Sequence, residues 1–328
     1  MQPIKLGGSM SGQLMFIARR VLLTIPTLFV MSIVVFLIIR LVPGDPVRTM
    51  LGFRATDANV AELRHQLGLD QSLFAQYGLW IGKLLHGDLG TDIVSHAPLS
   101  ELLMQRLPVT FELTGLSMLL AVAIGVPLGV WAAAGGRWVR RLTEGFVVFG
   151  ISIPDFWLGI MLVLLFTGTL MILPPSGYVP FAKDPAGNLR YMALPVLTLA
   201  IGEAAYILRT TRSAVTAVMG RPFVTFLRAK GISPRRILFG HVLRNAGPAI
   251  VTVIGIQVGV LLGGAIIVET LFALPGVGRL VVTGINQRNY PTVQVGVLAI
   301  ATIFIVVSLI TDLIVGWLDP RVADGAAT

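Results

Sequence analysis

The feature that most constrains this chain is a series of long apolar runs without charged side chains. The first is VLLTIPTLFVMSIVVFLII at residues 21–39. A helix that crosses the hydrocarbon core of a bilayer needs about 20 mostly apolar residues. The chain is 55% hydrophobic and only 12% charged, and soluble proteins average about 25% charged residues. The sequence therefore predicts a membrane protein with several helical spans.

The apolar runs predict an all-α, polytopic fold with six transmembrane helices. Arg19 and Arg20 precede the first run, but RLVPGDP follows it in place of a small-residue cleavage site. We therefore expect an uncleaved helix and not a signal peptide. The other predicted spans are residues 113–134, 145–173, 192–208, 248–271 and 293–317.

The composition also divides the chain along its length. After the first span the sequence becomes polar up to Arg106. Within this stretch Asp57 and Asp70 are typical of helix N-caps, and Gly87 is typical of a helix end. We expect a folded outer segment there. The predicted organisation is an N-terminal segment (1–20), a first transmembrane helix (21–41), a large outer loop (42–106), a five-helix core (107–320) with an inner loop at 214–246, and a tail (321–328).

The basic residues predict the orientation, because lysine and arginine favour the cytoplasmic side of short loops. Arg137, Arg140 and Arg141 fall in one short loop, and a denser basic group lies between residues 209 and 244. We expect both of these loops and both termini to be cytoplasmic. The formal charge of +9 thus belongs to an inner membrane face, which argues against nucleic acid as a partner.

Several kinds of site are excluded by missing residues or spacings. There is no cysteine, and His65, His86, His96 and His241 lack metal-ligand spacing, so we expect no metal site. The phosphate-binding pattern G-x-x-x-x-G-K-[ST] is absent, as are the H-E-x-x-H, G-x-G-D and G-x-S-x-G patterns of proteases and hydrolases. We therefore expect a membrane protein that is not an enzyme and binds no cofactor itself.

The segment TFLRAKGISPRRILFGHVLRN at 225–245 places basic, helix-forming residues between two apolar spans. Gly231 is placed to end one helix with a left-handed cap. Ser233 and Pro234 are placed to start another helix, as N-cap and first helical residue. Phe223, Phe226 and Leu227 offer an apolar face to a partner. An interfacial helix attracted to anionic lipid is the alternative, although such a helix gains nothing from a glycine break.

RAKG and SPRRILFGHVLRNA resemble the EAA loop of ABC-importer permeases, in the variant of the dipeptide/oligopeptide/nickel permease family. Gly231 matches the central glycine, whereas Thr225, Phe226 and Leu227 replace the eponymous Glu-Ala-Ala. The resemblance covers nearly the whole chain. The other similar segments are RLVPGDPV (40–47), LGLDQSLFAQYGLWIGKLLHGDLGTD (67–92), RLPVTFELT (106–114), SIPDFWLGI (152–160), LRTTRSAV (208–215), VETLFALPGVGRL (268–280), NYPTVQ (289–294) and DPR (319–321).

This resemblance implies an inner-membrane permease subunit driven by ATP and magnesium on separate subunits. The implied partners are a similar second permease, two cytoplasmic ATPases, an extracytoplasmic substrate-binding protein and membrane lipid. The glycine-broken helix would be a coupling helix that docks in the ATPase. The residues implied in coupling are Phe223, Thr225, Phe226, Leu227, Arg228, Ala229, Lys230, Gly231, Ser233, Pro234 and Arg235.

A few charged residues fall within or near the spans, where facing lipid is costly. Glu203 and Tyr206 are one helical turn apart, and either a translocation path or a structural contact between helices would explain them. Asp155 follows Pro154, which is consistent with a path residue or with the start of a helix in a broken third span. Glu112 and Asp312 lie near span ends, where water can solvate them.

The resemblance favours di- or oligopeptides as substrate, with nickel or another small solute as the alternative. A different class, the ion-coupled secondary transporter, would require paired charges in the membrane and usually repeat symmetry. No inverted repeat is visible in this sequence.

Overall fold

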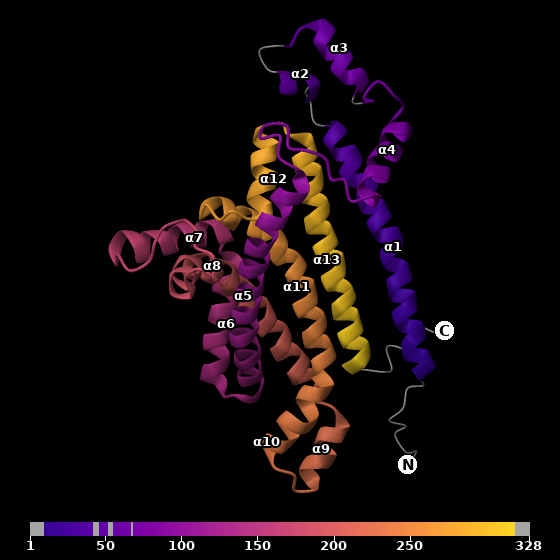
Figure 1. The fold of residues 1–328 in the computed structure, drawn as a ribbon. Coiled ribbons are helices and arrows are strands. Elements are labelled where there is room, and N and C mark those ends of the chain that lie inside the picture. Colours follow the sequence, from indigo (N-terminus) through magenta and orange to yellow (C-terminus); the bar gives the residue numbers. More distant parts are fainter. Residues whose placement is uncertain (1–9, 42–45, 52–54, 67, 319–328) are drawn as a thin grey trace.

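The computed structural model describes residues 10–41, 46–51, 55–66 and 68–318, and within these ranges the ordered elements are all helices. The motif DPR (319–321) and the predicted tail lie outside the described residues. The outermost part of the predicted N-terminal segment lies outside them too. The long apolar helices stand roughly side by side (Figure 1). They are α1 (Met10–Leu41), α5 (Leu99–Ala134), α8 (Pro185–Met219), α11 (Leu243–Leu271) and α13 (Tyr290–Leu318).

The predicted third span is not one straight helix. It consists of α6 (Arg137–Ser152) followed by α7 (Asp155–Val163) and the π-helix η2 (Leu164–Thr169). The helical path bends by 101° between α6 and the second half. Pro154 explains the break, because proline lacks the N–H of a continuing helix and forces the preceding residue into an extended conformation. Ile153 is indeed extended, with φ −91° and ψ 124°. With this pair counted as one span, the six predicted spans are confirmed.

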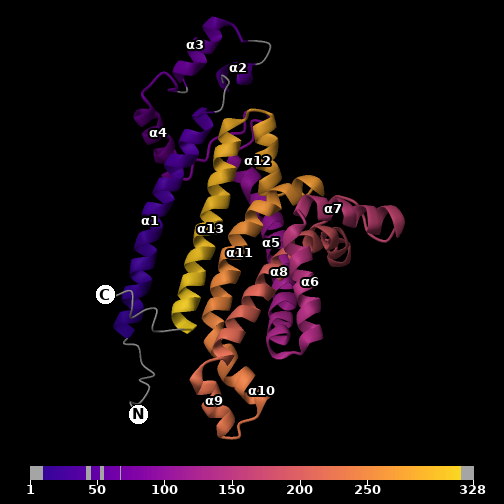
Figure 2. The ribbon, with the colours of Figure 1, turned by 180° about the vertical axis from the view of Figure 1, so that it is seen from behind.

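Two short-helix regions project from opposite ends of the bundle, as both views show (Figures 1 and 2). At one end, called the α3 end here, lie α2 (Pro46–Leu51), α3 (Asp57–Gln66) and α4 (Leu73–Leu85). At the other, called the α9 end, lie α9 (Pro222–Ala229) and α10 (Pro234–Ile237). The chain enters α11 from α10 through a second π-helix, η3 (Leu238–Val242). The remaining helix, α12 (Val277–Asn286), stands beside α13 near the α3 end.

Close approach of α5 and α8 forms the centre of the bundle. Gly125 and Gly129 of α5 permit it, because a Cβ on Gly129 would lie 2.6 Å from Thr211 Cβ and one on Gly125 would lie 2.8 Å from the Ala204 carbonyl oxygen. Small residues allow such packing where lipid supplies no hydrophobic drive between helices. The buried core beside this contact contains Val109, Leu113, Met192, Leu194, Val196, Leu199, Leu261, Ala265, Val268, Phe272 and Leu274.

The segment at the α3 end is anchored to α1 by aromatic side chains. Tyr77 of α4 packs edge-on against Phe36 at a ring-centroid distance of 5.2 Å, and its hydroxyl lies 2.7 Å from Ser32 Oγ. Trp80 lies beside both rings, 5.9 Å from Phe36 and 6.0 Å from Tyr77. These contacts fix α4 against α1.

The N-caps of α3 and α4 differ from the prediction by one or two residues. Ser72 caps α4 by accepting a bond from the Ala75 N–H, and Thr56 Oγ1 accepts one from Asn59 N–H at the start of α3. Asp57 is the first residue of α3. Asp70 instead lies 2.7 Å from His65 Nδ1, so its carboxylate is occupied by a side chain. Gly87 has φ +81°, which confirms the predicted helix end there.

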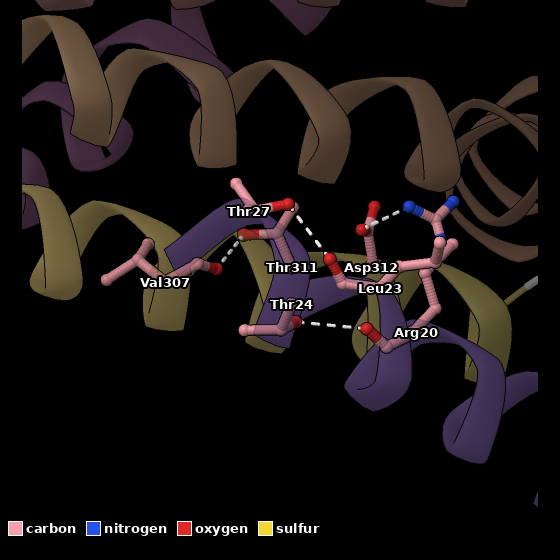
Figure 3. A network of polar contacts seen from close by, with 7 residues as sticks. All are labelled: Arg20, Leu23, Thr24, Thr27, Val307, Thr311 and Asp312. Carbon is pink, nitrogen blue, oxygen red and sulfur yellow. Dashed lines mark hydrogen bonds and ion pairs between the residues drawn. The ribbon is translucent and has the colours of Figure 1, made fainter. Parts of the chain in front are cut away.

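Helix α1 lies beside α13, and the two are joined near the α9 end by a charge pair (Figure 3). Arg20 Nη1 is 2.5 Å from Asp312 Oδ2. The neighbouring hydroxyls of Thr24, Thr27 and Thr311 donate to backbone carbonyls of their own helices, so the aspartate has the arginine as its partner in this network. Asp312 is thus partly exposed near a span end, as expected, and it also pairs with Arg20, which the sequence did not indicate.

Candidate functional site

The candidate coupling segment turns at Gly231 in a left-handed conformation, as predicted. Its φ is +74°, a value that a residue with a Cβ adopts only with strain. The Gly231 N–H donates to the Arg228 carbonyl at 2.9 Å, and the Ile232 N–H donates to the Leu227 carbonyl at 3.2 Å. This pair of bonds is the Schellman motif, which satisfies the last carbonyls of a helix. The turn between α9 and α10 is therefore defined by hydrogen bonds.

The helix after the turn begins where the sequence predicts, but its cap is incomplete. Ser233 is the N-cap and Pro234 the first helical residue. The Ser233 side chain makes no capping bond, so the proline alone sets this helix start. Directly after α10 the π-helix η3 inserts an extra residue into the helical path. Such elements often occur at functional sites, and no sequence pattern signalled this one.

The segment has one buried face and one exposed face. Val224, Ile237 and Val242 are almost fully buried, and they pack with residues of α5, α8 and α11. Phe226 is 56% exposed and Phe239, which the sequence analysis did not single out, is 65% exposed. A buried valine on the same short helix as an exposed phenylalanine means that α9 is fixed to the bundle and still offers apolar surface outward. Phe223 and Leu227 are half-buried between these faces.

The outer face is also basic. Arg228, Lys230 and Arg235 are exposed, and the Lys230 ammonium lies 4.6 Å from the centre of the Phe226 ring. Within the part of the chain that the structure describes, none of these three cations pairs with a carboxylate. The surface therefore suits an acidic partner with an apolar pocket. Thr225 and Ala229 of α9 are exposed as well.

Of the three predicted path residues, the structure brings Asp155 close to Glu203, because the Asp155 carboxylate lies against Gly202 of α8. Glu203 is buried and accepts a 2.8 Å hydrogen bond from Gln257 Nε2 of α11. Tyr206, one turn further along α8, is 42% exposed. Asp155 is the first residue of α7, and Pro154 before it is the N-cap without a side-chain capping bond. The aspartate thus follows the predicted break without capping the helix through its side chain.

A buried hydrogen-bond centre that the sequence analysis did not identify lies near the α3 end. Glu269 of α11 is fully buried and accepts bonds from Thr110 Oγ1 at 2.6 Å and from the Arg279 N–H at 2.9 Å. Thr110 Oγ1 in turn accepts from the Val277 N–H at 2.9 Å. These contacts join two of the resemblance segments, 106–114 and 268–280. A carboxylate within an apolar run was the only signal in the sequence.

Asp92 forms a second such centre between the segment that precedes α5 and the start of α13. Its buried carboxylate accepts from Asn289 Nδ2 at 2.6 Å, from Thr292 Oγ1 at 2.7 Å and from the backbone N–H groups of Val94 and Ser95. Burial alone would raise the pKa of Asp92, but the bonds from Ser95, Thr292 and Val94 outweigh it and the pKa is lowered. The loop is therefore held by an ionised aspartate.

Glu112 is also engaged with another side chain instead of being solvated by water alone. Tyr178, in the loop that leads to α8, donates its hydroxyl proton to Glu112 Oε2 at 2.7 Å. Burial, and next the hydrogen bond and charge of Glu112, raise the pKa of Tyr178 to about 12. The phenol is thus neutral at physiological pH, and it ties this loop to α5.

Curated relatives match almost the full length of the chain. The dipeptide transport system permease protein DppB of Escherichia coli (strain K12) is 38% identical over 334 residues, covering 94% of this chain and 98% of that protein. The di/tripeptide transport system permease protein DppB of Pseudomonas aeruginosa (strain UCBPP-PA14) is 38% identical over 331 residues, with 94% and 98% covered. Two family models match as well, and both describe membrane components of binding-protein-dependent transport systems.

A solved structure shares the fold. An inward-facing structure of the MetNI methionine ABC transporter aligns with a TM-score of 0.55 at 19% identity and covers 67% of this chain and 97% of that chain. The N-terminal family model spans residues 13–114, which include Asp92 and Thr110. The second model spans residues 125–324, which include the candidate coupling segment and Glu269. The chain belongs to the family of binding-protein-dependent transport system inner membrane components.

Proposed function

We propose that this chain is one permease subunit of an ABC importer and forms half of the path by which di- and oligopeptides cross the cytoplasmic membrane. The observation that carries the substrate class is the near-complete alignment with permeases named for dipeptide and di/tripeptide transport. Nickel or another small solute is the alternative within the same family, and membership of that family argues against the ion-coupled transporter.

The proposal includes partners that this chain needs for transport. They are a similar second permease, two cytoplasmic ATPases that bind ATP and magnesium, an extracytoplasmic substrate-binding protein, and lipid. The absence of a phosphate-binding loop from the sequence supports an ATPase on separate subunits. In this arrangement the α9 end and both termini are cytoplasmic, which the basic charge of residues 209–244 supports.

The exposed face of α9 is the proposed coupling surface. Phe226 and the cations around it would enter a groove of the ATPase, and the Gly231 turn would keep α9 and α10 in fixed relation. Rigid-body motion is the ordinary way in which closure of one domain is transmitted to another. Val224 and Ile237 support this role, because their burial fixes the segment to the bundle that must move.

Along the path we propose contacts from Tyr206 and Asp155, with Glu203 in a supporting position. Exposure of Tyr206 on α8 favours it as a contact residue, whereas the bond from Gln257 to Glu203 favours a structural role for that carboxylate.

Uptake into proteoliposomes tests the substrate and the energy source together. The chain would be assembled with its partner subunits, with ATP on the ATPase side, and supplied with labelled di- and tripeptides or with nickel. We expect accumulation of peptide that depends on ATP. Accumulation of nickel instead would overturn the substrate class, and uptake that follows an ion gradient without ATP would overturn the mechanism.

Substitution of Phe226 tests the coupling surface. Phe226→Asp places a charge where an apolar groove is expected, so we expect ATP hydrolysis to continue while uptake falls at least tenfold. Phe226→Leu keeps the apolar contact and should retain most of the uptake. Normal uptake by the aspartate variant would show that this face is not the coupling surface.

A further inference from the structure

A basic and aromatic surface at the turn from α5 to α6 has no role in the proposed path or coupling surface. The turn lies at the end of the bundle from which α9 and α10 protrude, as both views show (Figures 1 and 2). It carries Arg137, Arg140 and Arg141 together with Trp131 and Trp138. We call these five residues the α6 cluster.

The arginines of the α6 cluster differ in their partners. Arg140 Nε lies 3.6 Å from Glu144 Oε1, and this glutamate also pairs with Arg212 of α8 at 3.0 Å. Arg137 and Arg141 are exposed, and neither pairs with a carboxylate among the residues that the structure describes. Two positive charges at this turn are therefore not neutralised within the described chain.

The aromatic residues place these charges at the boundary between water and lipid. Trp138 is 74% exposed and Leu142, one turn further along α6, is 72% exposed. The Arg141 guanidinium lies 5.5 Å from the centre of the Trp138 ring, which fixes the cation over the indole face. Tryptophan is enriched at the level of lipid headgroups. The exposed Leu142 on the same helix is suited to contact the acyl chains.

We propose that the α6 cluster binds the phosphate of an anionic phospholipid in the leaflet on the α9 side. Arginine suits this ligand because its planar guanidinium donates paired hydrogen bonds to phosphate oxygens. Arg137 and Arg141 supply the charge, Trp138 orients Arg141 and lies against the glycerol region, and Leu142 contacts the acyl chain. The surface is both basic and apolar, which complements an anionic headgroup with its acyl chains. A cytoplasmic ATPase could cover this surface only by entering the membrane boundary, so we favour lipid as the partner.

The test measures lipid beside Trp138 in the assembled transporter, reconstituted in nanodiscs of phosphatidylcholine with a minor fraction of phosphatidylglycerol. In one sample the phosphatidylglycerol is brominated near its headgroup, and in another the phosphatidylcholine is. The fluorescence of the Trp138→Phe variant is subtracted from each, which isolates the quenching of Trp138. We expect stronger quenching by brominated phosphatidylglycerol than by brominated phosphatidylcholine at the same mole fraction. A basic residue near the membrane surface contributes about fivefold to the preference for anionic lipid.

Matched variants decide whether the site or the total charge is responsible. Arg137→Gln with Arg141→Gln should lower the preference for phosphatidylglycerol by roughly 25-fold, as two independent fivefold effects. Arg140→Gln should lower it by only about twofold, because the charge of Arg140 is partly offset by Glu144, which Arg140 shares with Arg212. A loss of about fivefold in Arg140→Gln, which is the value for any one basic residue near the surface, would assign the preference to net charge and overturn the site. Quenching by neither lipid would mean that a protein partner covers this face, which would also overturn it.

The proposal rests on the proposed orientation only for the choice of leaflet. The fluorescence measurement needs no transport activity, so failure of lipid binding and failure of the importer function give different results. Quenching that fails while ATP-dependent uptake is normal overturns the lipid site alone.

Discussion

Thr110 of α5 contacts two helices that are far from it in the sequence, α11 and α12, and its hydroxyl group is used twice. It donates to Glu269 and accepts from the Val277 N–H, while its side chain is 2% exposed. A buried polar group that loses its partner costs about 1–3 kcal/mol. At the scale of single residues, stability near the α3 end therefore depends on a few buried oxygens.

Replacement of Thr110 by valine tests this dependence. Thr110→Val keeps the shape but leaves Glu269 and the Val277 N–H each without one partner, so we expect a loss of about 1–3 kcal/mol in unfolding free energy. Thr110→Ser keeps the hydroxyl and should lose less than half as much. Chemical unfolding in detergent, followed by tryptophan fluorescence, measures both variants. Equal stability of the valine variant and the unchanged chain would contradict the hydrogen-bond argument.

Asp92 predicts a dependence on pH. Its pKa is lowered in the folded chain, so the stability that it contributes is present above the unfolded pKa of about 3.9 and is lost as pH falls through the folded pKa. We expect amide exchange at residues 289–296 to accelerate below about pH 4. Asp92→Asn cannot ionise, so its exchange should be faster at neutral pH and should lack this acid transition. An acid transition that persists in the asparagine variant would assign it to another group.

Among the helices, the contact between α5 and α8 depends on glycines at defined positions. A Cβ on Gly129 would lie 2.6 Å from Thr211 Cβ and 2.8 Å from the Leu208 carbonyl oxygen, and one of these is rigid backbone. Gly115, on the same helix, has no atom within 4 Å of such a Cβ. The two positions therefore form a matched pair within one element.

Alanine at these two glycines should have opposite effects. Gly129→Ala forces the helices apart and should cost about 1–3 kcal/mol, as overpacking does. Gly115→Ala meets open space and gains helix propensity, so stability should stay equal or rise by up to about 1 kcal/mol. Thermal unfolding in detergent would compare them. A larger loss at Gly115 than at Gly129 would show that α5 and α8 do not pack in this way.

On the scale of the whole molecule, the bundle carries two projecting regions at opposite ends, one before α5 and one between α8 and α11 (Figure 1). The α3 end is tied to α1 through Tyr77 and to α13 through Asp92. The α9 end is tied to α5, α8 and α11 through the buried cluster that includes Val224. Each region is thus connected to the long helices of the bundle by side-chain contacts.

Deletion of residues 57–87 tests the role of the α3 end. The deletion removes α3 and α4, whose side chains are mostly exposed, so we expect the chain to insert in the membrane and assemble with its partners. Binding of the substrate-binding protein, measured by surface plasmon resonance on the reconstituted transporter, should weaken at least tenfold. A less disruptive variant, Phe74→Asp, changes a side chain that is 91% exposed and should weaken binding in the same direction. Unchanged binding by both would remove this region from the docking surface.

Much of the element content was predictable from the sequence. The apolar runs predicted six spans, and Gly231 and Pro234 predicted a turn whose φ and helix start the structure confirms. Local signals suffice here, because a span depends on length and hydrophobicity and a left-handed turn depends on the absence of a Cβ. The N-caps at Thr56 and Ser72 were missed by one or two residues, since several neighbouring polar residues can serve as caps.

The sequence by itself thus determined that the chain is a multi-span helical membrane protein with a glycine-broken basic segment between two spans. Only the tertiary structure decided that Glu269 meets Thr110, that Asp92 meets Thr292 and that Asp312 pairs with Arg20. The physical reason is sequence distance: spans follow from local transfer free energy, whereas a buried carboxylate finds its partner only when helices far apart in the chain pack together.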